Sequence, residues 1–158
     1  MRLYLLAAAA LASAASAQTA PEVSYATSAE IKQLIAKAKA TIKPGEPVLV
    51  QPLLQFAPYK AVLEYRQGAT GAAVHRVEAE YFTVLEGGGD LVQGGTLVGQ
   101  TAPDERNFMG TAIAGGTKRH VAAGDVLVIP ENTPHWFNRV DGRLVMISLK
   151  VPRTGANR

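Results

Sequence analysis

Residues 124–138 read GDVLVIPENTPHWFN and are the most informative stretch of the chain. The opening Gly-Asp pair indicates a turn, and the apolar run after it predicts a strand that ends at Pro130. Residues 132–134 (Asn-Thr-Pro) predict a second tight turn, and His135 opens the next strand. A histidine held directly after a rigid turn has a nearly fixed backbone position, which a metal ligand or catalytic imidazole needs.

A second stretch, HRVEAEYFTVLEG at residues 75–87, begins with a histidine and has a carboxylate five positions later. One imidazole and one carboxylate are too few to hold a transition metal, so any such site needs a partner from elsewhere in the chain. The histidine at position 135 is the candidate partner.

From residue 47 onward the chain consists of short β-forming runs separated by Gly, Pro and Asp-Gly. With no second helical pattern between them, these runs predict an all-β sandwich or barrel. No helix follows the glycines of LEGGGD and QGG, as a phosphate loop would require, so we interpret them as tight turns between strands and Asp141-Gly142 as a hairpin turn. The runs are PVLVQPLL, YKAVLEYR, AAVHRVE, EYFTVLEG, DLVQGG, TLVGQT, NFMGTAIAGG, DVLVIP, HWFNRV and RLVMISLKV.

The N-terminal stretch MRLYLLAAAALASAASAQ has one arginine, an apolar run and the small-residue triplet Ala-Ser-Ala. That order predicts a signal peptide, residues 1–17, cleaved after Ala17, and therefore periplasmic or secreted localisation. Residues 18–46 predict a leader and one helix that Thr27 or Ser28 caps and a Pro-Gly pair ends. The narrow apolar stripe of this helix predicts packing against the outside of a sheet.

Composition excludes several functions. The chain has no cysteine, which excludes disulfides and thiol chemistry. Its formal charge of +3 is not gathered into a basic cluster, so we expect no nucleic-acid partner. No run of about 20 apolar residues predicts a membrane span, and no GxSxG pattern indicates a serine hydrolase. We expect one domain at residues 47–151 and a C-terminal tail at residues 152–158.

The two stretches together resemble the motifs of the cupin superfamily, G(X)5HXH(X)3-4E(X)6G and G(X)5PXG(X)2H(X)3N. Matched at the family spacing are Gly124, Pro130 and His135 in the second motif, and His75, Glu80 and Gly87 in the first. The resemblance covers roughly residues 47–151 and is greatest to small exported single-domain cupins. It implies a double-stranded β-helix, the jelly-roll barrel, with one N-terminal helix, and fixes the fold better than the activity.

The sequence departs from these motifs in two important places. Asn132 stands where glycine is usual, and the first motif has one histidine instead of two. Counting back from Glu80 makes His75 the second histidine and puts Ala73 in place of the first. The other count makes His75 the first histidine and puts Val77 in place of the second. We prefer the count from Glu80, because it keeps the family spacing.

The resemblance implies a divalent metal site, and strand alternation predicts that His75, Glu80 and His135 point into the barrel. Two imidazoles and one carboxylate with open positions suit Fe, Mn, Ni or Zn. The alternative is structural: His75 and Glu80 could hydrogen-bond each other, and His135 could satisfy backbone groups in its turn.

Four other residues are weaker candidates. We expect His120 at the surface, and Trp136, opposite in phase to the neighbouring histidine, to pack at the sheet surface or contact a subunit. Tyr65 and Arg66 are possible pocket residues whose strand phase the sequence leaves open.

The predicted function is that of an exported cupin that binds a divalent metal and acts on a small organic molecule, with dioxygenase, isomerase and lyase chemistry left open and no catalytic residue assigned. The alternative is a non-catalytic cupin that binds a small molecule and has lost part or all of its metal site. The resemblance also implies a possible homodimer.

Overall fold

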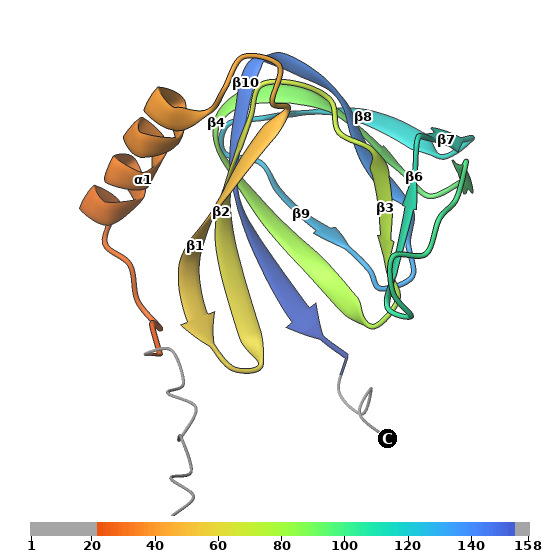
Figure 1. Ribbon diagram of the computed structural model, residues 1–158, viewed down its shortest axis with the longest axis horizontal. Helices are drawn as coiled ribbons and strands as arrows, with labels where there is room; N and C mark the ends of the chain where they lie inside the picture. Colours follow the sequence, from red (N-terminus) through yellow and green to blue (C-terminus); the bar gives the residue numbers. More distant parts are fainter. Residues whose placement is uncertain (1–21, 154–158) are drawn as a thin grey trace, which may run out of the picture.

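The computed structural model describes residues 22–153 (Figure 1). The predicted signal peptide, residues 1–17, and most of the predicted tail lie outside the described residues. In chain order the elements are α1 (Ser28–Thr41), β1 (Val48–Phe56), β2 (Tyr59–Arg66), β3 (Ala72–His75), β4 (Glu78–Gln93), β5 (Thr96–Val98), β6 (Asn107–Gly110), β7 (Ala112–Ala114), β8 (Thr117–Ala122), β9 (Val126–Ile129) and β10 (His135–Pro152).

The barrel is built around its two longest strands, β4 and β10, which pair antiparallel from Glu78 opposite Pro152 to Gln93 opposite His135. β10 also pairs with β2, which pairs with β1, while β3 links β10 to β6. β8 and β9 pair with β4, and β5 and β7 form a separate two-stranded sheet. Figure 1 shows the strands wrapped around one interior, with the helix outside. The predicted all-β jelly-roll barrel with one N-terminal helix is confirmed.

Helix α1 begins where the sequence predicts and ends at Thr41, three residues before the predicted stop at Pro44. The Thr27 hydroxyl accepts a hydrogen bond from the Glu30 backbone N–H, and the Glu30 carboxylate accepts one from the Thr27 N–H, so a capping box closes the first turn. Ile31, Leu34, Ile35 and Ala38 pack on Leu63, Tyr65 and Val145, on the outside of the barrel. No helix between residues 22 and 153 combines the length and apolar character needed to cross a bilayer.

The predicted turns at LEGGGD and Asp141-Gly142 are wrong. β4 continues through Gly87–Gly89 and β10 through Asp141–Gly142, and the two segments face each other. Between the pairs Val140–Gly89 and Leu144–Gly87, three residues of β10 lie opposite one of β4, which is a bulge. Gly87 has φ +73°, and a Cβ there would lie 1.9 Å from the Arg143 carbonyl oxygen. The glycines therefore bend a continuous pair of strands where two backbones approach closely.

Other strand boundaries also differ from the prediction. The runs EYFTVLEG and DLVQGG belong to one strand, as do HWFNRV and RLVMISLKV, while NFMGTAIAGG is divided between β6 and β7 in different sheets. β8 was not predicted, because only Val121 of its six residues is buried and the run shows no apolar face.

Two groups of buried apolar side chains lie on opposite faces of the main sheet. The outer group lies beneath α1. The inner group fills the barrel and consists of Phe82, Val84, Leu91, Val121, Ile129, Phe137, Leu144 and Met146. Phe82 and Phe137 meet edge to face with ring centroids 5.5 Å apart. These two rings also line the cavity described below, so the apolar core forms its floor.

Candidate metal centre

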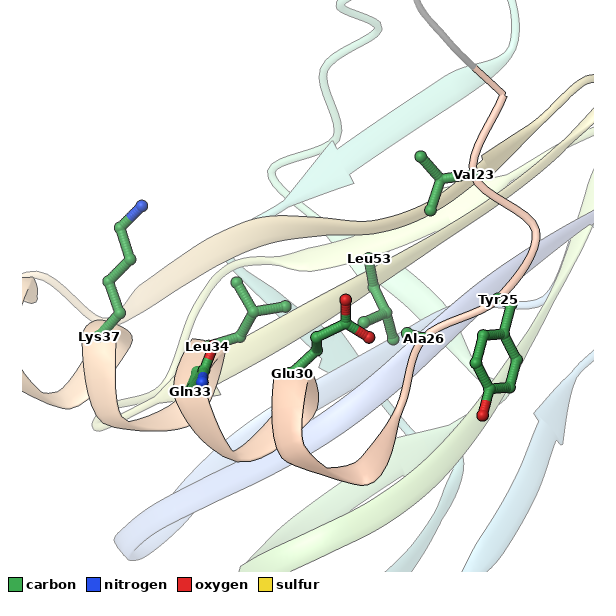
Figure 2. Close-up of a pocket in the computed structure, with 8 residues that line it drawn as sticks. All are labelled: Val23, Tyr25, Ala26, Glu30, Gln33, Leu34, Lys37 and Leu53. Carbon is green, nitrogen blue, oxygen red and sulfur yellow. The ribbon is translucent and has the colours of Figure 1, made fainter.

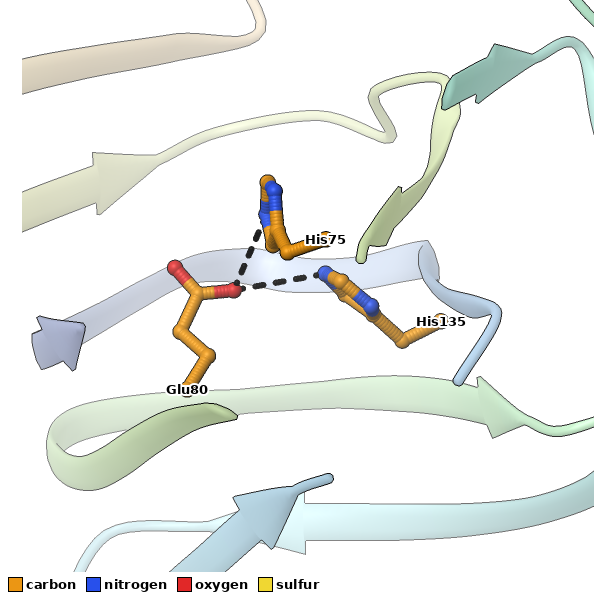
Figure 3. Close-up of side chains that lie close together, drawn as sticks. All are labelled: His75, Glu80 and His135. Carbon is orange, nitrogen blue, oxygen red and sulfur yellow. Dashed lines mark ion pairs between the residues drawn. The ribbon is translucent and has the colours of Figure 1, made fainter. Parts of the chain in front are cut away.

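Three strands bring His75, Glu80 and His135 together in the barrel interior. His75 ends β3, Glu80 lies near the start of β4, and His135 opens β10 (Figure 3). One nitrogen from each imidazole and one carboxylate oxygen all lie within 4.8 Å of one another. The structure therefore assembles the three side chains that the sequence singles out.

The turn before β10 positions His135. Asn132 has φ +58° and, within residues 22–153, is the only non-glycine residue in the left-handed region. Asparagine tolerates this conformation better than most residues, so it can replace the glycine of the family motif. The Asn132 backbone N–H donates to the His75 carbonyl oxygen at 2.6 Å. The same turn therefore places His135 and ties it to the end of β3.

The hydrogen-bond partners of both imidazoles fix their tautomers. Nδ1 of His75 lies 2.6 Å from Oδ1 of Asn107, and Nδ2 of Asn107 donates to the Asp104 carboxylate, so the amide oxygen must face the histidine. Nδ1 of His135 lies 3.2 Å from the Thr133 carbonyl oxygen. Since both partners can only accept, each Nδ1 carries a proton. In the neutral imidazoles each Nε2 is left with a lone pair.

Those two Nε2 atoms face the same carboxylate oxygen. Oε2 of Glu80 lies 3.4 Å from Nε2 of His75 and 3.4 Å from Nε2 of His135 (Figure 3). The other oxygen, Oε1, accepts a 2.8 Å hydrogen bond from the Ser148 hydroxyl. Ser148 thereby holds the carboxylate with Oε2 toward the rings. Without a proton or a metal ion between them, three electron-rich atoms would face one another.

The pKa shifts of Glu80 and His75 also indicate that a positive charge is stabilised between these side chains. Burial by itself raises the pKa of Glu80, but hydrogen bonds and charges from His135 and His75 outweigh it and hold that pKa well below its usual range. Burial lowers the pKa of His75, while its interactions with Glu80 and Asn107 outweigh burial and raise it overall. The carboxylate is therefore ionised, and the cluster stabilises a cation beside it.

The donor set fits a transition metal. Ligand atoms about 2.0–2.2 Å from a metal ion lie roughly 2.8–3.1 Å apart in octahedral and roughly 3.3–3.6 Å apart in tetrahedral coordination. Both distances to Oε2, 3.4 Å, match the tetrahedral case and exceed the octahedral one by a few tenths of an ångström. The Nδ1 hydrogen bonds are the outer partners that metal-bound histidines commonly have. Two imidazoles and one carboxylate suit Fe, Mn, Ni or Zn and leave coordination positions open.

A cavity of about 320 Å³ opens beside the cluster. Its volume is at the lower end of the range for small-molecule sites, roughly 300–1,000 Å³. Apart from the three cluster residues, its walls are formed by Val48, Glu64, Arg66, Thr70, Gly71, Ala73, Phe82, Met109, Trp136, Phe137 and Lys150.

Arg66 and Glu64 form a tight ion pair on the cavity wall. Nε and Nη2 of Arg66 lie 2.8 and 2.7 Å from Oε2 of Glu64, and Nη1 donates to the Thr70 hydroxyl at 2.9 Å. The guanidinium also lies 4.8 Å from the centre of the Phe137 ring. Of the two residues whose phase the sequence left open, Arg66 therefore faces the cavity, while Tyr65 is buried beneath α1.

Solved structures with the same fold include three at low sequence identity. A protein from Bacillus halodurans, BH2720, is 16% identical over 75% of this chain and 77% of its own, with a TM-score of 0.51. The cupin domain of Cnp3 from Schizosaccharomyces pombe is 11% identical over 72% and 74%, with a TM-score of 0.50. Fe(II)-HppE is 15% identical over 70% of this chain and 53% of its own, with a TM-score of 0.51.

The chain has the cupin fold. It spans about half the length of HppE. No protein-family model and no curated protein matches the sequence. The similarity to these solved structures therefore rests on the fold of the backbone. The resemblance of the two sequence motifs to those of cupins agrees with it.

His75 lies on β3, so the position of the histidine that the first motif lacks can be sought on or next to this strand. Ala73 lies two residues before His75 on the same strand, pairs directly opposite His135, and lines the cavity. Val77 lies beyond the end of β3 and is not among the lining residues. This placement favours the count in which Ala73 replaces the first histidine.

The sequence analysis missed four residues that line the cavity or contact the cluster: Glu64, Asn107, Ser148 and Lys150. Ser148 and Lys150 share a face of β10 with Leu144 and Met146, both of which are buried. A polar residue at an inward-facing position of a strand was therefore the sequence pattern that could have identified Ser148 and Lys150. No pattern in the sequence pointed to Asn107, because its contact with His75 depends on the pairing of β3 with β6.

Of the remaining weaker candidates, His120 lies away from the cluster and Trp136 lies on the cavity wall. His120 is half exposed on β8, as expected. Trp136 packs at the edge of a small apolar group with Phe108 and Ile113 and donates its indole N–H to the Thr70 carbonyl oxygen at 2.6 Å. The ring packs within this apolar group and also lines the cavity, while a subunit contact stays a prediction.

A second cavity of about 310 Å³ lies on the outside of the cupin barrel, between α1, β1 and the segment before the helix (Figure 2). Its carboxylate, Glu30, is already engaged in the capping box. This cavity therefore lacks the convergent polar groups that the inner one has. It is lined by Val23, Tyr25, Ala26, Glu30, Gln33, Leu34, Lys37 and Leu53.

Proposed function

We propose that this protein is exported, binds a divalent transition metal through His75, Glu80 and His135, and acts on a small organic molecule held in the adjacent cavity. The observation that carries the proposal is the convergence of two Nε2 lone pairs on one carboxylate oxygen, with both Nδ1 atoms already committed to acceptors. Such an arrangement leaves room for one cation and binds it through all three residues.

Fe, Mn, Ni and Zn all suit this donor set, and the fold likeness to an Fe(II) protein keeps iron among them. When bound, such a metal would supply Lewis-acid or redox chemistry at a substrate oxygen. The chain's own residues orient and enclose the site. Ser148 aims the Glu80 carboxylate, and the rings of Phe82 and Phe137 form an apolar floor that keeps bulk water from the cluster.

Elemental analysis of the purified protein tests the metal site. We expect about one metal ion per chain in the wild type, and a loss of bound metal in His75→Ala and His135→Ala. His120→Ala is the matched control, because it removes a histidine that lies outside the cluster. A wild-type content below about a tenth of an ion per chain, under several loading conditions, would contradict the proposal.

The second candidate is a cupin that binds a small molecule without catalysis. The observation that favours it is Ala73, an alanine on the cavity wall at the position where the motif, counted back from Glu80, would have a histidine. The two candidates differ in one measurable respect. A ligand that binds the metal-free wild type and the His75→Ala variant equally well would support the binding protein over the metal enzyme.

Export and dimerisation belong to the same proposal. Expression of the full chain in a bacterial host should yield a mature protein that begins at Gln18 in the periplasmic or secreted fraction, as measured by mass spectrometry. A full-length chain confined to the cytoplasm would contradict export.

Light scattering after size exclusion should give the mass of two chains if the protein is a homodimer.

A further inference from the structure

Arg66 and Lys150 are the two Lys or Arg side chains that line the cavity beside the cluster, and of these only Lys150 lacks a close carboxylate partner among the described residues. Its Nζ lies 3.6 Å from Oε2 of Glu78, and both side chains are about one third exposed. Partly exposed pairs at such a distance contribute little, because water screens them. Arg66 differs in having two nitrogens within 2.8 Å of the buried Glu64 carboxylate.

The position of the Lys150 ammonium leaves the metal-binding nitrogen of His75 free. Nζ lies 3.3 Å from Nδ1 and 3.4 Å from Nε2. An ammonium in line with the Nε2 lone pair would lie much farther from Nδ1, so the near-equal distances place it against the ring instead. The Nε2 lone pair still points at Glu80 while a positive charge lies immediately beside it.

With a divalent metal bound, the charges that line the cavity would have a positive excess. Glu64 neutralises Arg66, and Glu80 contributes one negative charge to the cluster. With a divalent ion on Glu80 and two neutral histidines, the cluster would carry a net positive charge, and Lys150 would add another beside it. Two neighbouring positive charges repel in a partly buried site unless an anion lies between or beside them.

We propose that Lys150 binds the carboxylate of a small organic acid, whose apolar body lies against Phe82, Phe137 and Trp136 next to the metal. This inference rests on the proposed metal centre and deepens it by naming the substrate class. Lys150 lines both the main cavity and a smaller adjoining one of about 190 Å³, so its ammonium is reachable from the space that a ligand would occupy. In the main cavity, apolar walls and a single cation without a close carboxylate partner suit a monocarboxylate better than a polyanion.

The chain offers a matched control for this lysine. Lys60 lies directly opposite Lys150 in the β2–β10 pairing, so the two side chains share a face, and Lys60 lines the smaller cavity. Lys60→Met and Lys150→Met thus remove the same charge from the same face, but only Lys150 contacts His75. Lys150→Arg keeps the charge and serves as a rescue variant.

Calorimetry on zinc-loaded protein would test the proposal with acetate, butyrate and benzoate, and with acetamide, butyramide and benzamide as neutral counterparts. In the wild type we expect at least one acid to bind about tenfold more tightly than its amide, the effect of one charge-assisted hydrogen bond. Lys150→Met should abolish that preference, Lys150→Arg should retain most of it, and Lys60→Met should change the dissociation constant less than about twofold.

Zinc affinity, measured first on the same samples, separates the two proposals. Failure of the wild type to bind zinc would count against the metal centre. If zinc binds but all three acids bind no better than their amides, or if Lys150→Met and Lys60→Met behave alike, the assignment of Lys150 is wrong. We expect Lys150→Met to bind zinc as tightly as the wild type or more tightly, because a neighbouring positive charge is removed.

Discussion

Within residues 22–153, histidine and carboxylate side chains meet at two places in this barrel, which differ in how many cations surround the carboxylate. In the inner cluster, His75 and His135 present lone pairs to the carboxylate of Glu80. In an outer cluster, where β4, β8 and β10 meet, the carboxylate is already surrounded by cations. The outer cluster consists of Asp90, Lys118, His120, Arg139 and Asp141.

Asp90 shows how a buried carboxylate is satisfied without a metal. Its oxygens lie 2.7 Å from Nζ of Lys118, 2.9 and 3.0 Å from two nitrogens of Arg139, and 3.1 Å from Nδ1 of His120. The hydrogen bond from Arg139 is the largest cause that holds the pKa of Asp90 well below its usual range, followed by Lys118 and His120. The same residue types thus form an ion-pair network when cations saturate the carboxylate, and a candidate metal site when they do not.

The largest effect on zinc affinity should come from replacing the central carboxylate of the inner cluster, and replacing that of the outer cluster should have little effect. Glu80→Gln should lower zinc affinity more than about 100-fold, because it removes a ligand, and loss of an outer partner alone typically costs 10–100-fold. Asp90→Asn should change zinc affinity less than about twofold. Competition with a chelating dye measures both. Equal losses in the two variants would mean that metal binding does not depend on the inner cluster.

Next, Asp90→Asn should destabilise the fold at neutral pH, because Lys118 and Arg139 lose their shared carboxylate. The pKa of Asp90 is depressed, so its contribution to stability is present above the ordinary aspartate pKa of 3.8 and is lost as the pH falls below it. The difference in free energy of unfolding between wild type and variant should therefore shrink from pH 7 to pH 3, as urea titrations can measure. A difference that stays constant over this range would refute the ion-pair account.

Smaller effects should come from the groups that orient the imidazoles. Asn107→Ala removes the acceptor of the His75 Nδ1–H and should weaken zinc binding about tenfold. Asp141→Ala removes a neighbour of His120 in the outer cluster and should leave zinc affinity unchanged. The same dye competition applies, and a loss in Asp141→Ala equal to that in Asn107→Ala would show that orientation of His75 is not the cause.

The smallest effect concerns the turn that holds His135. Asn132→Ala should cost about 1 kcal/mol of stability, because alanine adopts the left-handed conformation less readily, whereas Asn132→Gly should change stability by less than about 0.5 kcal/mol. Urea unfolding of both variants measures this. If the two substitutions cost the same, the left-handed conformation is not the reason for asparagine at this position.

Much of the fold could be read from local patterns. The N-terminal cap of α1 and the β-rich runs are properties of a few neighbouring residues, and the cap and the all-β character occur as predicted, although several strand boundaries do not. The three candidate ligands came from the spacing of two motifs. Glycine-rich segments were misread, because glycine serves a hairpin turn and a bulge equally well, and only the facing strand decides between them.

By itself, the sequence determined the helix, the β-rich barrel and the identity of His75, Glu80 and His135, because local conformation and motif spacing are encoded along the chain. Only the tertiary structure decided the continuity of β4 and β10, the tautomers of the two histidines, and the position of Lys150 beside His75. Each of these depends on groups that are distant in sequence: Asn107 on β6 sets one tautomer, and β10 brings Ser148 and Lys150 to the cluster. Such partners are chosen by strand pairing, which no short stretch of sequence contains.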